Sequence, residues 1–519
     1  MTSAMTARFS RIDALVLLVM LVAFGWAYRN AVSSGPYTYD EADYMTAGSH
    51  GFAANYLERP SLSVMDFVKA GLNRGMQAGK RKSLSEWIRG SGDITFYRHF
   101  HGPVYFYWIS AVGPLVHFDE AAMRRSGFVF HLLTFVAIYL GVLLLAERDA
   151  RLAALLASFL FLFSDPDVGT ASQITPHIPY VFFTTLSLLL FARFLQTGRF
   201  AWWHAALAAC AFAFCSIEYA ILLLITFAIC LWIFRERLFG NCTRPQLVRF
   251  ATRSIILFFG ILLLLWPIGL LELSAIKSYF YIGYLALLRK GSFGTEPFYM
   301  IWWHRVVASP LEYGLAVVCG LFAAVRWRRL SSTGALLLFL IYAALMLLTT
   351  LKNTSLNPTY VSSILPAMAV VSGIVLAAWL GRLPAAPKAV MATILLVLIA
   401  IGGVWHLVDQ QRRAHDFNLN QVLVENVRQG GSIAAIVVPY EYMPTISYYF
   451  PQMKVHPILP TDNAAAVLES VREGSYRNLV YAGQNEDELP RRLRALYRVD
   501  AQTLGPAGNG RQLFLYRLS

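Results

Sequence analysis

The stretch "IDALVLLVMLVAFGWAY" (Ile12–Tyr28) is almost wholly apolar, and "YTYDEADYM" (Tyr37–Met45) follows it with three carboxylates. The apolar pattern extends through the chain of 519 residues, in which 57% of residues are hydrophobic and only 14% are charged. The mean hydropathy is +0.51. Because about a quarter of the residues in soluble proteins are charged, this composition predicts a polytopic α-helical membrane protein.

Eleven apolar runs are predicted to be transmembrane helices. They are Ile12–Tyr28, Phe128–Ala146, Leu152–Phe163, Ile178–Phe194, Trp202–Cys215, Ala220–Phe234, Ile255–Leu271, Leu311–Val325, Ala335–Leu351, Val361–Leu380 and Val390–His406. Several fall short of the roughly 20 residues that a straight span needs, so some boundaries are expected to shift by a turn. A twelfth run, "PVYFYWISAVGPLVHF" (Pro103–Phe118), decides on which side of the membrane every later loop lies.

The basic residues favour one topology. If Pro103–Phe118 does not span, sixteen Lys and Arg residues lie in loops on one side of the membrane and five in the short loops on the other. Short cytoplasmic loops carry the excess of Lys and Arg, so we expect this run to lie along the membrane surface. The N-terminus is then cytoplasmic, whereas the loop of about residues 30–125 and the C-terminal tail face outward from a plasma or inner membrane. The net charge of +14 lies mostly in the inner loops, which indicates contact with membrane lipids and not with nucleic acid.

The tail, residues 409–519, is predicted to be a small extracytoplasmic α/β domain. The predicted strands are "SIAAIVVP", "KVHPI", "NLVYAG" and "RQLFLYRL", and the predicted helices are "NAAAVLESVREG" and "DELPRRLRALY". This alternation favours a mostly parallel sheet. The tail contains no Gly-rich dinucleotide motif and no P-loop, so no cofactor is predicted, and its expected role is to pack over the first outer loop.

The carboxylates Asp40, Glu41 and Asp43 allow two interpretations. Thr38 with Glu41, or Asp40 with Asp43, matches a capping box, and acids are favourable at a helix N-terminus. Three carboxylates just outside a span are equally well placed to deprotonate or bind a polar substrate. The residues by themselves leave both interpretations open.

Four features resemble a known superfamily. An acidic pair follows the first span in a long outward loop. The other three features are the segments "HFHGPVYFYWI" (His99–Ile109), "EPFYMIWWHRVVASP" (Glu296–Pro310) and "NPTYVSSILPAMAV" (Asn357–Val370). In their order and topology, about residues 10–405 resemble the GT-C glycosyltransferases, in the family 39-like branch of the protein O-mannosyltransferases and the lipid A aminoarabinose transferases.

The resemblance implies a function. Residues 1–408 would be a GT-C transmembrane catalytic domain, and the chain a hexosyl- or pentosyltransferase. Such enzymes pass a sugar from a polyprenyl-phosphate donor to an acceptor hydroxyl on a protein, lipid or glycan at the outer face, with inversion. The family's acidic pair maps onto Asp40 as general base and Glu41 as the residue that positions the acceptor or the cations of the cavity.

The resemblance also implies contacts to the sugar and to the phosphate. Asp43 adjoins the acidic pair, and His177 in "TPHIPYVFF" stands where the family often has a second acid, a role that Asp165 or Asp167 could take. The residues expected to bind the phosphate are His101, Lys352 and Tyr360, in family-like segments, together with Arg98, Arg289 and Lys290.

Two alternatives qualify this interpretation. Clustered carboxylates suit Mg²⁺ or Mn²⁺, but a metal would neutralise the proposed base and the resembled branch is generally metal-independent, so no metal is predicted. A transporter or flippase for a lipid-linked or polar solute is the rival function. It would need charges in the middle of the membrane, whereas the acids and bases of this chain gather at the outer ends of the spans.

Overall fold

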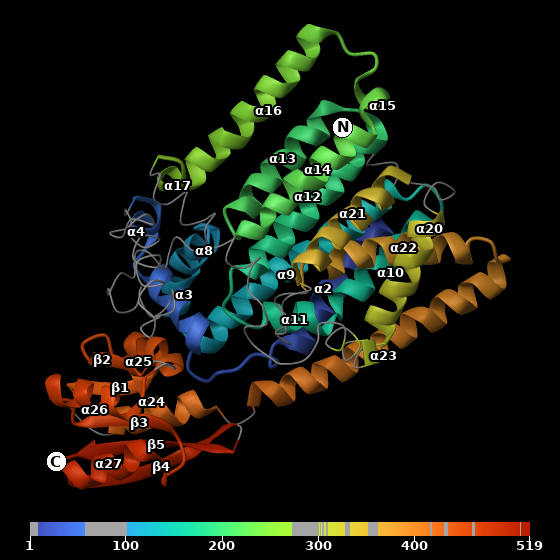
Figure 1. Cartoon of the computed structure of the whole chain (residues 1–519). Helices are drawn as coiled ribbons and strands as arrows, with labels where there is room; N and C mark the ends of the chain where they lie inside the picture. Colours follow the sequence, from blue (N-terminus) through green and yellow to red (C-terminus); the bar gives the residue numbers. More distant parts are fainter. Residues whose placement is uncertain are drawn as a thin grey trace.

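The computed structural model describes two parts of the chain, a helical body and a small domain with a sheet (Figure 1). The described residues are 9–57, 101–271, 300, 303, 306–307, 310–326, 333–350, 362–415, 418–429, 434–458, 462–508 and 510–519. The predicted site residues Arg98, Arg289, Lys290, Lys352 and Tyr360 lie outside this part of the chain.

All the described secondary structure in the first half of the body is helical. Its elements are α2 (Arg11–Tyr28), α3 (Tyr39–Ser49), α4 (Phe52–Leu57), α8 (Val104–Val112), η1 (Gly113–Val116), α9 (Glu120–Leu145), α10 (Ala150–Leu162), α11 (Asp165–Ala171), α12 (His177–Thr197), α13 (Phe200–Phe214), η2 (Glu218–Ala220), α14 (Ile221–Ile233), α15 (Arg235–Phe239), α16 (Arg244–Leu265) and α17 (Pro267–Leu271). The second half contains η3 (Pro310–Gly314), α20 (Leu315–Arg326), α21 (Thr333–Thr350), α22 (Leu365–Leu380) and α23 (Ala385–His415).

Every predicted apolar run overlaps one or more of these helices. By length and composition, α2, α9, α12, α16 and the helix that begins at Ala385 can each cross a membrane, and α10 with α11, bent by 58°, would make a sixth span. Most of the other runs coincide with shorter apolar helices. The chain is therefore an integral membrane protein, and the count of eleven crossings stays a prediction.

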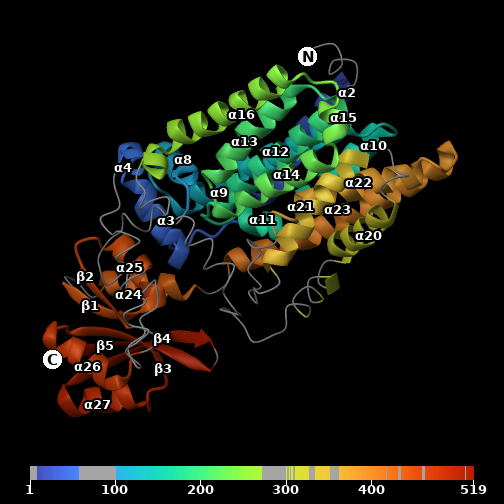
Figure 2. The ribbon, with the colours of Figure 1, turned by 45° about the horizontal axis from the view of Figure 1, so that its top comes forward.

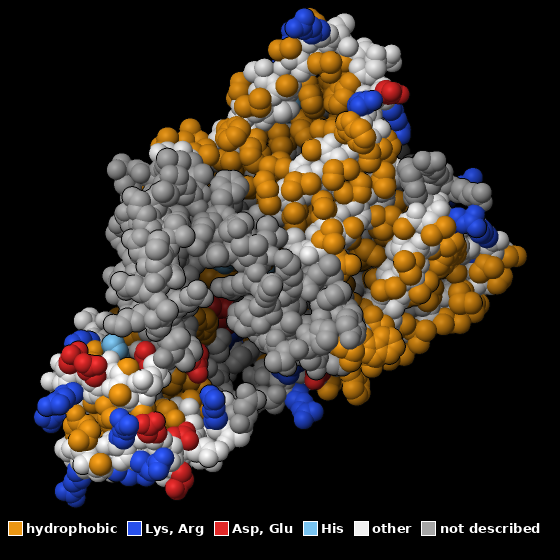
Figure 3. Space-filling model, in the orientation of Figure 1, with side chains coloured by type: hydrophobic (Ala, Val, Ile, Leu, Met, Phe, Trp, Pro, Cys, Tyr) orange, Lys and Arg blue, Asp and Glu red, His pale blue; other side chains and the backbone are white. Residues whose placement is uncertain are grey.

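Apolar packing holds the body together, and its outer surface is apolar as well. The core joins α9, α10, α12, α13 and α22, whereas Ile255, Ile256, Phe259 and Leu264 on α16 are exposed. Figure 3 shows hydrophobic side chains over the helical body and charged side chains gathered over the C-terminal domain. An exposed apolar surface of this extent is what a lipid environment requires.

The one carboxylate in the first apolar run has a local explanation. Asp13 caps α2, because its carboxylate accepts hydrogen bonds from the backbone N–H and the hydroxyl of Ser10, both at 2.7 Å. Tyr139 of α9 donates to the same side chain at 2.8 Å, and Arg151 of α10 at 3.2 Å. A buried carboxylate is tolerated when it is paired in this way.

The run Pro103–Phe118 forms α8 and η1, and α8 has only nine residues. It packs against α3 and α4 at one end of the body (Figure 1). A helix of this length is too short to cross a bilayer, for which about 20 residues are needed. Its length agrees with the prediction that this run does not span.

The C-terminal domain is a five-stranded sheet with helices. Its elements are α24 (Leu419–Gln429), β1 (Ala435–Pro439), η6 (Tyr440–Tyr442), α25 (Met443–Tyr449), β2 (Lys454–Ile458), α26 (Ala464–Glu473), β3 (Asn478–Gly483), α27 (Glu488–Leu496), β4 (Val499–Gly508) and β5 (Arg511–Leu518). The strand order is β2-β1-β3-β5-β4. The small domain and its predicted strands are therefore present.

The prediction of a mostly parallel sheet was wrong. Strand β1 pairs in parallel with β2 and β3, but β5 pairs antiparallel with both β3 and β4, so the sheet is mixed. The reason is the hairpin β4–β5, whose first strand contains Gly505, Pro506 and Gly508 and shifts register twice. Glycine and proline interrupt the alternating pattern by which a strand is recognised.

The C-terminal domain lies against the end of the body that carries α3 and α8. Figures 1 and 2 both place α25 beside α3. The long helix α23 leads from the body to this domain. The segment with the three carboxylates therefore lies between the body and the C-terminal domain.

Candidate active site

Helix α3 begins with the capping box that the sequence predicts for Thr38 and Glu41. The Glu41 carboxylate accepts hydrogen bonds from the backbone N–H of Thr38 at 3.1 Å and from its hydroxyl at 3.3 Å. This interaction satisfies donors that a helix start leaves without an intrahelical partner. The capping interpretation is thus confirmed for Glu41.

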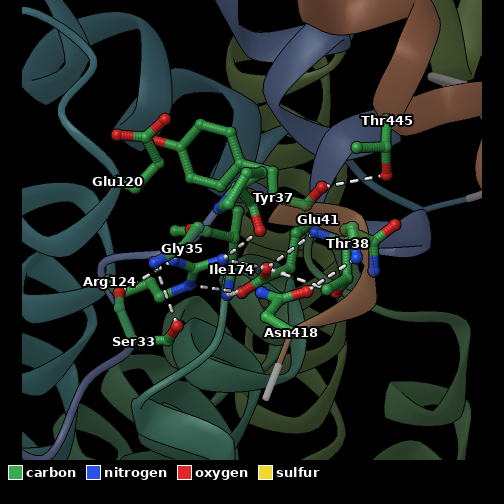
Figure 4. A network of polar contacts seen from close by, with 12 residues as sticks. Ser33, Gly35, Tyr37, Thr38, Glu41, Glu120, Arg124, Ile174, Asn418 and Thr445 are labelled. Atoms are coloured by element: carbon green, nitrogen blue, oxygen red, sulfur yellow. Dashed lines mark hydrogen bonds and ion pairs between the residues drawn. The ribbon is translucent and has the colours of Figure 1, made fainter. Parts of the chain in front are cut away.

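Glu41 also forms a buried ion pair with Arg124 of α9 (Figure 4). The guanidinium donates to both carboxylate oxygens, from Nε at 3.0 Å and from Nη2 at 2.5 Å. The backbone N–H of Ile174 adds a third donor at 3.0 Å. Burial acts to raise the pKa of Glu41, but the Arg124 charge and these hydrogen bonds hold it below its ordinary value, so the carboxylate is ionised.

Arg124 joins α9 to the chain that leads into α3. Besides Glu41, it donates to the backbone oxygens of Ser33 at 2.8 Å, Gly35 at 2.7 Å and Pro36 at 3.2 Å. Figure 4 shows its side chain at the centre of this network. Sequence reasoning missed this residue, although a buried acid requires a cation and Arg124 stands just before an apolar run.

Asp40 and Glu41 occupy different environments although they are neighbours. Residues that follow one another on a helix point about 100° apart, and Asp40 is exposed where Glu41 is buried. Asp43 follows Asp40 by one turn and is half-buried. Asp40 is therefore the carboxylate of the acidic pair that an incoming molecule can reach.

His101 lies next to α3 and is held by a residue from another loop. Its Nδ1 is 3.0 Å from a carboxylate oxygen of Glu218 in η2. The ring of Tyr44, one turn after Asp40, lies 5.9 Å from the His101 ring between centroids. The structure thus brings His101 to the same end of the body as the acidic pair.

The Gly that follows His101 is required by close packing. A Cβ on Gly102 would lie 2.1 Å from the backbone of Cys215. The backbone N–H of Val104 also donates to the Cys215 carbonyl at 3.1 Å. The turn that follows α13 therefore fixes the His-Gly-Pro segment, and with it the His101–Glu218 pair.

His177 is half-buried at the first position of α12. The loop that joins α11 to α12 leads into it. The same loop supplies Ile174, whose N–H binds Glu41. His177 and the acidic pair therefore lie around one loop.

The acids of α11 lie in a second polar cluster. Asp165 pairs with Arg413 of α23 at 2.6 Å, and Glu312 of η3 pairs with His406 at 2.9 Å. The carboxylate of Asp167 is buried beside them. Sequence reasoning named the two aspartates but missed this cluster, whose members come from three separate segments of the chain, α11, η3 and α23.

Comparison with known proteins gives the same fold. The family model described as dolichyl-phosphate-mannose-protein mannosyltransferase matches residues 100–266. The crystal structure of ArnT from Cupriavidus metallidurans bound to undecaprenyl phosphate is similar, with a TM-score of 0.58, 13% sequence identity and coverage of 98% of each chain. The apo structure of the same protein gives a TM-score of 0.57 at 12% identity, again with 98% of each chain covered. No curated protein sequence matches the chain.

These similarities agree with the organisation described above. The family match begins just before His101 and ends at Trp266, so it includes the start of α9, the His101–Glu218 pair and His177. The similarity of fold extends over both the helical body and the C-terminal domain. The chain therefore has a GT-C glycosyltransferase fold of the ArnT type, and its resemblance to the branch of protein O-mannosyltransferases and lipid A aminoarabinose transferases is confirmed.

Proposed function

We propose that this chain is an inverting glycosyltransferase that moves a sugar from a polyprenyl-phosphate donor to an acceptor hydroxyl at the outer face of the membrane. The observation that carries the proposal is the exposed carboxylate of Asp40, next to a buried Glu41–Arg124 pair in an ArnT-like fold. The similar ArnT structure contains undecaprenyl phosphate, which supports a polyprenyl phosphate as carrier.

Asp40 is the general base of the proposed reaction. The acceptor oxygen attacks the anomeric carbon while the bond to the phosphate oxygen breaks, and the phosphate leaves with the electron pair. Asp40 takes the acceptor's proton, which makes the oxygen a better nucleophile. Because one displacement takes place, the configuration at the anomeric carbon inverts.

Glu41 has a different role in this proposal. Its two oxygens already accept hydrogen bonds from Arg124, Ile174 and Thr38, and its pKa is held low. Such a carboxylate is a poor proton acceptor. Glu41 therefore positions the first turn of α3, and through it Asp40, and does not contact the acceptor.

The leaving phosphate needs cationic donors close to the acidic pair. His101 is the described residue that fits, since the Glu218 carboxylate orients its ring through the 3.0 Å contact at Nδ1. We propose that Asp43 and His177 face the sugar, and that Arg98, Arg289, Lys290, Lys352 and Tyr360 complete the phosphate site. The outer loop and the C-terminal domain are proposed to be extracytoplasmic, with no metal taking part.

The proposal is tested by sugar transfer in proteoliposomes. Purified wild-type protein is given a panel of labelled polyprenyl-phosphate sugars with protein, lipid and glycan acceptors, and the product's anomeric configuration is determined by NMR. We expect transfer from one class of donor, with inversion. Absence of transfer from every donor would contradict the function, and retention of configuration would contradict the single displacement.

A further inference from the structure

The C-terminal domain contacts the residue that leads into α3 through both of its backbone polar groups. The N–H of Tyr37 donates to the hydroxyl of Tyr449 at 3.0 Å, and its carbonyl accepts from the hydroxyl of Thr445 at 2.9 Å. Tyr449 and Thr445 both belong to α25. Figure 4 shows Thr445 reaching toward this backbone from the C-terminal domain.

The hydroxyl of Tyr449 connects three elements. While it accepts from Tyr37, it donates to Glu120 in the first turn of α9 at 2.7 Å. Burial and the Glu120 carboxylate both raise the pKa of Tyr449 above its ordinary value, so the hydroxyl keeps the proton that it donates. One side chain of α25 therefore joins α9 to the start of α3.

Apolar and aromatic contacts surround these hydrogen bonds. Tyr37 is fully buried, and its ring lies 5.3 Å from that of Tyr448 and 6.3 Å from that of Tyr449, between centroids. The Arg124 guanidinium lies 5.2 Å from the centre of the same ring. Hydrogen bonds in a buried environment of this kind fix geometry more strongly than exposed ones do.

A second contact from the tail lies two residues earlier. A Cβ on Gly35 would come within 2.6 Å of the side-chain nitrogen of Asn418, and the Gly35 carbonyl is the one that Arg124 binds at 2.7 Å. The segment before α3 thus lies between α9 and the tail, and a larger residue at position 35 would displace the Asn418 side chain.

Two anchors therefore flank Asp40. On one side α25 holds the backbone of Tyr37, and on the other Arg124 holds the side chain of Glu41. The first turn of a helix has N–H groups without intrahelical partners, so external contacts decide where it lies. A displacement of about 1 Å in a catalytic group can cost about a hundredfold in rate.

We propose that the C-terminal domain, through Tyr449 and Thr445, positions Asp40 for the transfer reaction. The inference rests on the proposed function, and it makes Tyr449 a positioning residue that acts on the rate through the backbone of Tyr37. The C-terminal domain would then contribute to the reaction by positioning Asp40, in addition to packing over the first outer loop.

The test compares Tyr449→Phe with Tyr448→Phe. The first variant removes the hydroxyl that binds Tyr37 and Glu120, whereas the second removes a neighbouring hydroxyl that makes no hydrogen bond within the described residues. We expect Tyr449→Phe to lower kcat about tenfold, with the KM for the lipid donor unchanged, because the alignment is weakened and the binding groups remain. Tyr448→Phe should retain wild-type kcat.

A double-mutant cycle separates positioning from general stability. If Tyr449 acts through Asp40, Tyr449→Phe should have no further effect on the residual rate of Asp40→Asn, whereas a merely structural effect would be additive. Wild-type kcat in Tyr449→Phe, or additivity with Asp40→Asn, would overturn the inference while leaving the proposed function in place.

Hydrogen exchange tests the anchor without an activity assay. We expect the amides at the start of α3 to exchange faster in Tyr449→Phe than in Tyr448→Phe, with unchanged exchange in β1 and β3 of the same domain. Equal exchange in the two variants would overturn the inference. This measurement needs no sugar donor, so it tests the contact between α25 and Tyr37 even if the wild type transfers no sugar. Absence of transfer would contradict only the proposed function.

Discussion

At the scale of single residues, burial assigns different roles to two neighbouring acids. Asp40 is exposed, whereas Glu41 is buried against Arg124. Removing one partner of a buried pair leaves a charge without compensation and costs about 3 to 5 kcal/mol. Loss of the Glu41–Arg124 pair should therefore lower the free energy of unfolding.

Arg124→Met should destabilise the protein by about 3 kcal/mol, since Glu41 would remain buried without its cation. Thermal unfolding in detergent measures this loss. The control is Arg125→Met on the same helix, because Arg125 is exposed and, in the part of the chain that the structure describes, donates only to the Arg29 carbonyl. Equal stability of the two variants would contradict the structural role of the pair.

The pair also predicts a dependence on pH. The pKa of Glu41 lies below the usual 4.5 in the folded protein, so the stabilisation is present above about 4.5 and is lost as the pH falls through the folded-state pKa. Glu41→Gln should therefore be less stable than the wild type at neutral pH, and the difference should shrink in acid. A difference that grows toward low pH would contradict the assignment.

Glu218 and His101 should act as a unit. Glu218→Gln and His101→Gln are each expected to raise the KM for the donor several-fold, and the double variant should be little worse than either one, because each change breaks the same 3.0 Å contact. Steady-state kinetics with varied donor provides the measurement. Additive effects on KM would show that Glu218 does not act through His101.

At the scale of elements, the sequence predicted the helices well because their apolar runs are long. It also located β1, β2, β3 and β5, whose hydrophobic residues are continuous or alternate. It missed β4, where glycine and proline break the pattern, and α25, whose seven residues are too few for a helical period to show.

The candidate site was predictable only where local sequence carries the signal. The acidic pair and the His-Gly-Pro segment stand out along the chain, whereas the partners Arg124, Glu218 and Tyr449 lie 83, 117 and 412 residues from the groups they contact. Tertiary packing brings such partners together. The periodicity of the local sequence does not predict which distant residues will meet.

Gly102→Ala tests the packing of the His-Gly-Pro segment. A methyl group there would lie 2.1 Å from the Cys215 backbone, so the turn would have to move. We expect a lower unfolding temperature and weaker donor binding. Gly25→Ala on α2 is the matched control, since nothing lies within 4 Å of its added Cβ, and it should be neutral or slightly stabilising. A neutral Gly102→Ala would contradict the close approach.

At the scale of the whole molecule, the segment with the three carboxylates and the C-terminal domain lie at one end of the body, and the arginine-rich start of α16 lies at the other (Figure 1). The excess of basic residues predicts that the latter end faces the cytoplasm. The apolar surface between them, seen in Figure 3, is where the lipid would lie. The predicted topology rests on the charge bias and the hydropathy together.

Cysteine labelling in intact cells tests this orientation. In a Cys242→Ser background, which removes the one native cysteine that is not buried, Glu469→Cys on α26 should react with a membrane-impermeant thiol reagent. Glu236→Cys on α15 should react only after the membrane is permeabilised. The reverse pattern would place the C-terminal domain in the cytoplasm and contradict the topology.

The most direct measurement is sugar transfer by Asp40→Asn, alongside binding of the lipid donor. Asparagine keeps the shape of the side chain but cannot accept the proton, so the rate should fall by about a hundredfold or more while donor binding is retained. The Glu236→Gln variant also replaces a carboxylate by an amide, but at the opposite end of the body, and it should transfer sugar at the wild-type rate. A wild-type transfer rate in Asp40→Asn would contradict the role of Asp40 as general base. Asp40 would then be only a residue that favours the start of α3.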